Sequence, residues 1–226
     1  MCASGTMRAC RAFACVAISA RRAFARVAMD ACRTFACAAM GARRVFACAA
    51  LLACCGAAGA QDATPPPGLT ELCKTTLCRT PKVRVNMGDG AVFEGTQPYA
   101  LPVLLNGGVS VYLGEQVYIE AQVEKGELTL LRAVPAVADP ARTLVFKFQQ
   151  KPGAVDSLLE VTNPFKSDLK FSLGMMLPDG SSLRATSSCP VRAGLKLFEH
   201  WPYPIYQLVV VKARALKEGE SRDCVP

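Results

Sequence analysis

The chain has 226 residues and a formal net charge of +8, which is unevenly distributed. Residues 1–60 hold eight arginines against one acidic residue, whereas residues 61–226 hold 18 basic and 17 acidic residues, a net charge of only +1. Nucleic-acid-binding domains carry a clustered excess of Lys and Arg. The balance after residue 60 therefore argues against nucleic acid as a partner.

Residues 1–39 carry three copies of a sequence repeat with a period of 11 residues, and a fourth copy follows at Arg44. Arg11, Arg22, Arg33 and Arg44 each begin nearly the same heptapeptide: RAFACVA, RAFARVA, RTFACAA and RVFACAA. Eleven residues make about three helical turns, so an amphipathic helix on a membrane surface is one interpretation. Ala and Cys fill most other positions, and we favour a duplicated, unstructured segment ahead of a working start at Met40 or Met29.

Residues 40–60 have the outline of a secretory signal peptide. A basic head and an apolar stretch end in small residues at 58–60, which is the usual order of such signals. We expect the exported protein to begin at Gln61, with a Pro-rich linker over residues 61–70. The predicted location is periplasmic or secreted.

Two other export signals overlap the same stretch. Residues 51–54 read LLAC and resemble a lipobox, which would leave Cys54 lipidated and the domain anchored to a membrane. Arg43 and Arg44 resemble the core of a twin-arginine signal. Membrane attachment is expected only in the lipobox case.

Four of the 12 cysteines lie after residue 60, namely Cys73, Cys78, Cys189 and Cys224. An even number in an exported domain predicts two disulfides, and a zinc site is disfavoured in an oxidising compartment. We favour pairing of the two early cysteines with the two late ones. Closing loops of roughly 100 residues restricts the unfolded chain more than closing a short one, but a local Cys73–Cys78 bridge remains the alternative.

The rest of the chain is dominated by strand patterns. Alternating apolar residues predict strands at 81–87, 116–123, 127–134, 143–149, 168–175 and 182–186, and the apolar run 206–213 predicts a central strand. Glu124-Lys125-Gly126 predicts a hairpin turn. No helix of ten or more residues is expected after residue 70. We predict an all-β, two-layer antiparallel sandwich over residues 71–226, immunoglobulin-like in the broad sense, with a small closed β-barrel as the alternative.

Residues 198–206, FEHWPYPIY, form the densest aromatic cluster and contain His200, the only histidine. Two prolines predict an irregular loop ahead of the last strand. Trp201, Tyr203, Tyr206 and His200 form the candidate binding surface for a glycan or peptide. The favoured alternative is that these rings cap the core with their hydroxyls in water. No G-x-S-x-G elbow occurs, and we expect no catalytic residue, no metal and no cofactor.

Residues 155–211 carry a resemblance to known proteins. The stretches LLEVTNPFKSDLKFSLGMMLPDG, SSCPVRAG and FEHWPYPIYQLVV resemble a group of small exported bacterial β-sandwich proteins of unassigned function. The resemblance implies the sandwich fold and brings no catalytic residue with it.

These observations predict a non-enzymatic, exported cell-envelope module that binds another protein or a polymer. The alternative is a small periplasmic hydrolase or redox protein that uses His200 or a labile disulfide. A binding module is expected to expose an apolar patch, whereas an enzyme needs a concave pocket with converging polar groups.

Overall fold

The computed structural model describes residues 64–180 and 182–224. A compact unit begins at Thr64. The predictions for the repeat, the signal peptide and Cys54 lie outside the described residues. Within those residues, no helix is long and apolar enough to span a membrane.

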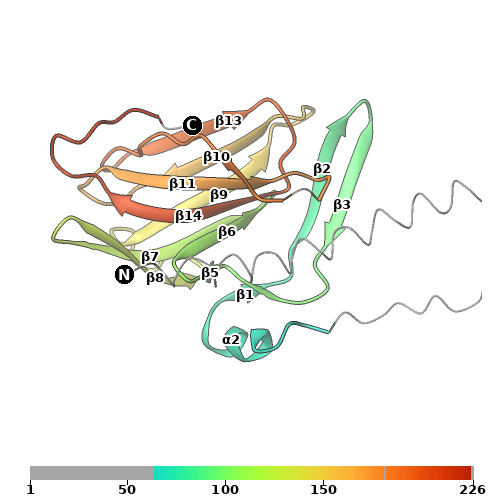
Figure 1. Cartoon of the computed structure of the whole chain (residues 1–226), viewed down its shortest axis with the longest axis horizontal. Helices are drawn as coiled ribbons and strands as arrows, with labels where there is room; N and C mark the ends of the chain where they lie inside the picture. The colour runs from blue at the N-terminus through green and yellow to red at the C-terminus, as the bar shows by residue number, and fades with distance from the viewer. Residues whose placement is uncertain (1–63, 181, 225–226) are drawn as a thin grey trace, which may run out of the picture. The chain divides into compact units, whose positions relative to one another are not determined.

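One layer is a five-stranded antiparallel sheet in the order β13-β10-β9-β7-β8 (Figure 1). Strand β9 contains the predicted alternation: Leu144, Phe146 and Phe148 are buried, and Val145 and Lys147 between them are only partly buried. The turn between β7 and β8 has positive φ at Lys125 and Gly126, which confirms the hairpin. The strands are β7 (Gln116–Glu124), β8 (Glu127–Val134), β9 (Thr143–Gln150), β10 (Ser157–Thr162) and β13 (Lys196–Trp201).

The second layer is a five-stranded antiparallel sheet in the order β12-β11-β14-β6-β5. The apolar run near the end of the chain forms β14 at its centre, which confirms the central strand predicted at 206–213. Residues 207–210 of β14 are all buried, so neither face carries polar alternation there, whereas Val211 is 50% exposed. The strands are β5 (Leu104–Leu105), β6 (Gly108–Tyr112), β11 (Leu169–Met176), β12 (Arg184–Thr186) and β14 (Gln207–Ala215).

The core lies between the two sheets and confirms the predicted sandwich. The ring of Phe146 in the first sheet meets that of Phe171 in the second edge-to-face, with centroids 5.5 Å apart. Ile119 and Leu159 from one sheet and Val111 from the other are fully buried with them. The sheets keep edge strands and do not close into a barrel, so the barrel alternative is wrong.

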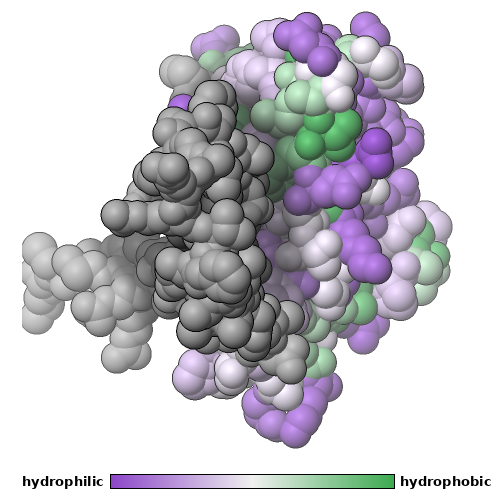
Figure 2. Space-filling model, turned by 90° about the vertical axis from the view of Figure 1, so that its right-hand side faces the viewer, coloured by the Kyte–Doolittle hydropathy of each residue, from purple (hydrophilic) through white to green (hydrophobic). Residues whose placement is uncertain are grey.

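The residues before β5 form a separate layer of short elements on the sandwich. They are α2 (Leu69–Thr75), β1 (Cys78–Arg79), β4 (Leu101–Pro102), which pairs with β1, and a hairpin of β2 (Lys82–Gly88) and β3 (Ala91–Thr96). The hairpin stands beside the sandwich (Figure 1). From that side, the described surface is mostly hydrophilic with a hydrophobic area among polar residues (Figure 2).

The hairpin is joined to the sandwich by side chains. Gln150 at the end of β9 accepts a hydrogen bond from the backbone N–H of Asn86 at 2.8 Å and donates one to its carbonyl at 2.8 Å. The Gln150 side chain thus makes with the Asn86 backbone the two hydrogen bonds that a neighbouring strand would otherwise make. Phe93 of β3 packs edge-to-face on Tyr206, with ring centroids 5.7 Å apart.

The four cysteines form two disulfides, but the favoured pairing is wrong. Cys73 is bonded to Cys78, and Cys189 is bonded to Cys224. The early cysteines flank the end of α2, where the chain reverses over five residues and brings them together. The late pair joins the C-terminal tail to the connection between β12 and β13. Loop entropy favoured the long-range pairing, but it acts only on cysteines that the native fold brings together.

Candidate functional site

The structure places the predicted aromatic residues in two different environments. Trp201 is 4% exposed and Tyr206 is 9% exposed. The indole N–H of Trp201 donates to the Thr186 hydroxyl at 2.8 Å, and Tyr206 packs between the rings of Phe93 and Tyr112. These two rings belong to the interior and present little surface to a ligand.

Tyr203 and His200 lie nearer the surface. The hydroxyl of Tyr203, which is half-buried, lies 3.6 Å from the sulfur of Met175. His200 Nε2 lies 2.9 Å from Asp156 Oδ2, and about half of the His200 side chain is exposed. The four candidate residues therefore do not form one continuous surface.

Ser157, the serine nearest the His200–Asp156 pair in the sequence, is not placed to act as a nucleophile beside His200. Ser157 follows Asp156 directly, but its hydroxyl is fully buried. That hydroxyl donates to the Tyr203 carbonyl at 2.9 Å and accepts from the Ile205 N–H at 3.0 Å. It ties the crossover between β13 and β14 to β10, which is a structural role.

The irregular loop predicted for the segment 198–206 is wrong for residues 198–201, which belong to β13, and is confirmed for residues 202–206, which lie between β13 and β14. The two prolines come directly after β13 and do not interrupt it. Leu197, Glu199 and Trp201 point inward, whereas Lys196, Phe198 and His200 are exposed. Each set mixes apolar and polar residues, which is why the alternation is hard to see in the sequence.

β13 is an edge strand whose pairing partner is β10. The backbone N–H of Asn163 donates to the Leu195 carbonyl at 3.0 Å, and the same register continues to Ser157 opposite Trp201. Hydrogen-bonded pairs alternate along an antiparallel ladder, so residues 197, 199 and 201 bond β10. The backbone groups of Lys196, Phe198 and His200 point away from it, and we call them the β13 edge. No strand of residues 64–180 or 182–224 pairs with this edge.

The β13 edge combines an apolar side chain with charged neighbours. Phe198 is 58% exposed, the highest fraction among the large hydrophobic residues described. Lys196 forms an ion pair with Glu160 on β10. On the inner face, burial raises the pKa of Glu199, partly opposed by the Cys189 N–H that donates to its carboxylate at 2.5 Å.

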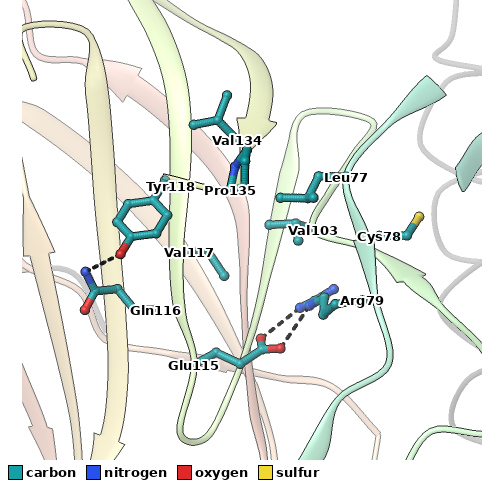
Figure 3. A pocket seen from close by; sticks show the side chains of 10 residues that line it. All are labelled: Leu77, Cys78, Arg79, Val103, Glu115, Gln116, Val117, Tyr118, Val134 and Pro135. Atoms are coloured by element: carbon teal, nitrogen blue, oxygen red, sulfur yellow. Dashed lines mark hydrogen bonds and ion pairs between the residues drawn. The ribbon is translucent and has the colours of Figure 1, made fainter. Parts of the chain in front are cut away.

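A pocket of about 180 Å³ lies beside β7 and the end of β8, on the side of the first sheet away from β13 (Figure 3). Gln116 and Tyr118 of β7 line one side, with the Gln116 amide donating to the Tyr118 hydroxyl at 2.9 Å. Leu77, Cys78 and Arg79 line the other side, and Glu115 lies at its base (Figure 3).

The charged groups of the pocket are already engaged. The Arg79 guanidinium bonds both carboxylate oxygens of Glu115 at 3.0 Å, the carbonyls of Leu101, Pro102 and Ser110, and the Ser110 hydroxyl. It also lies over the Tyr112 ring, 5.0 Å from its centroid. An arginine offers five N–H donors, and here all have acceptors. The group therefore anchors β1 to the sandwich and has no donor left for a ligand.

The described part of the chain contains no group of three or more His, Cys, Asp or Glu side chains arranged to hold a metal ion. Burial raises the pKa of Tyr112 and of Tyr206, so both phenols stay protonated. Neither phenol is poised for acid–base chemistry.

No family model, curated protein or solved structure matches the chain. The β13 edge is the best candidate site among the described residues because it offers unpaired backbone groups beside an exposed aromatic ring. The sequence places Phe198 within the aromatic cluster but does not single it out. Phe198 lies two residues from both Lys196 and His200, and this spacing is the sequence signal that the three side chains share the outward face of one strand.

Proposed function

We propose that the protein is a non-enzymatic, exported cell-envelope module that binds another polypeptide by adding a strand to the β13 edge. The observation that carries the proposal is an edge strand of six residues with outward backbone groups and Phe198 beside them. Strand addition gains affinity from main-chain hydrogen bonds and specificity from alternate side chains.

Export is part of this proposal, and two features support it. Segment 40–60 has the outline of a bacterial export signal, and two disulfides suit an oxidising compartment. Natural proteins cover or charge their edge strands to prevent unwanted pairing. An exposed aromatic ring at this edge is therefore a feature that favours a specific partner strand.

Site-specific photocrosslinking tests the proposal. The full-length sequence is expressed in an exporting host with a photoreactive phenylalanine at position 198, and a second variant carries it at Val137, an exposed apolar position away from β13. After irradiation of the cells we expect covalent polypeptide adducts at 198 and several-fold fewer at 137. Equal labelling at both positions, or adducts that contain no polypeptide, would contradict strand addition at β13.

A further inference from the structure

Resting on the proposed function, we propose that the strand that occupies the β13 edge is β13 of a second copy of this chain. The two strands pair antiparallel about a two-fold axis through Phe198. The two five-stranded sheets of the two copies then join into one continuous sheet.

The register follows from which residues point outward. Lys196, Phe198 and His200 are three alternate positions, so a two-fold axis at the central one pairs all of them. Phe198 lies opposite Phe198 of the second copy, and Lys196 lies opposite its His200. Each pair exchanges two backbone hydrogen bonds, as outward groups in an antiparallel ladder do.

The side chains at these positions complement one another in this register. Directly opposite residues share a face of the sheet, so the two exposed Phe198 rings meet and lose water-accessible surface together. Lys196, which pairs with Glu160 of its own copy, comes to lie beside the His200–Asp156 pair of the other copy. This places a cation next to a pair that contains a carboxylate, at both ends of the joint.

The size of the joint sets its strength. Six residues on each side bury less than the roughly 1,200 Å² of a stable interface. We therefore expect a concentration-dependent dimer, which forms where the exported protein is abundant or confined and which dissociates on dilution.

Disulfide trapping tests the register on the purified exported protein. Opposite residues of a hydrogen-bonded pair have Cα atoms about 5.5 Å apart, within the range of a disulfide. Phe198→Cys should therefore form a covalent dimer on mild oxidation. Lys196→Cys alone should not, because the two copies of position 196 lie about 13 Å apart, four residues along the strand.

A mixture supplies the decisive control. Lys196→Cys protein mixed with His200→Cys protein should give a covalent heterodimer at least tenfold above either protein alone, with the native disulfides intact by peptide mapping. Sedimentation of the parent, which carries no introduced cysteine, should show dimer at high concentration, and Phe198→Lys should abolish it while keeping the thermal melt of the parent.

The outcomes separate this inference from the proposed function. If no position forms a dimer, or if all three cysteine variants form it equally, the second copy is not the occupant. Polypeptide adducts at position 198 in cells would then still support strand addition by another protein. Loss of both the dimer and those adducts would overturn the proposed function as well.

Discussion

Replacing Trp201 with alanine should destabilise the sandwich more than any change at its exposed neighbours. A buried Trp removes about 150–250 Å² from water, which at ~25 cal/mol per Å² amounts to ~4–6 kcal/mol as an upper bound. Substitutions of buried Trp by Ala typically cost about 3–5 kcal/mol. Because Trp201 is 4% exposed and bonded to Thr186, we expect a loss in this range.

Differential scanning calorimetry measures this loss directly. In a domain of this size, 1 kcal/mol lowers Tm by about 2–4 °C, so Trp201→Ala should melt about 6–20 °C below the parent. Trp201→Phe keeps a ring and removes the N–H, and it should recover most of the loss. His200→Ala is the matched control on the same strand, because it removes only a surface contact with Asp156, and such contacts contribute at most about 1 kcal/mol.

One result would refute the reasoning about Trp201. If Trp201→Ala melted within about 2 °C of the parent, the ring would not close the core. A variant that kept its Tm but lost its crosslinked partner would return this segment to the role of a binding surface.

Two further predictions concern the polar contacts that hold the chain ends. Arg79→Ala should lower the free energy of unfolding in urea by about 2–4 kcal/mol, because it leaves the Glu115 carboxylate, only about a fifth exposed, without its cation. The control Arg84→Ala, on the exposed hairpin, should change that free energy by under about 0.5 kcal/mol. Equal effects of the two variants would contradict the anchoring role of Arg79. The N–H of Ala193 and the salt bridge to Arg222 lower the pKa of Asp168 below its ordinary value of 3.8. Ionised Asp168 therefore stabilises the fold above pH 3.8, and this contribution is lost as the pH falls through the lowered pKa. Asp168→Asn should lower Tm at pH 7, and the difference in Tm from the parent should shrink below about pH 4.

The sandwich could be predicted because its strands repeat one physical pattern. Phe146 and Phe148 alternate with Lys147 and Gln149 on a strand with one buried face, and the apolar run in β14 includes residues 207–210, which are all buried. The turn at Lys125 and Gly126 needs two positive φ angles, which favours Gly at the second position. Such local rules hold wherever a strand lies in the sheet.

The candidate site could not be predicted in the same way. Which strand lies at an edge depends on the pairing of β13 with β10, and no local pattern fixes that order. Glu199 faces inward because it accepts the Cys189 N–H, which places a polar residue where the alternation needs an apolar one. The disulfide pairing depends likewise on a tertiary contact, since Cys224 reaches Cys189 only after β14 has crossed the sheet.

The bond between Cys189 and Cys224 has a mechanical consequence. A force applied at the two chain ends passes through this bond and bypasses the 35-residue interval that it closes, which contains both β13 and β14. At about 3.5 Å per residue, the stretched chain is shorter by ~12 nm than its length predicts. Tension along the chain therefore cannot pull out either the central strand of one sheet or the edge strand of the other until that bond is reduced.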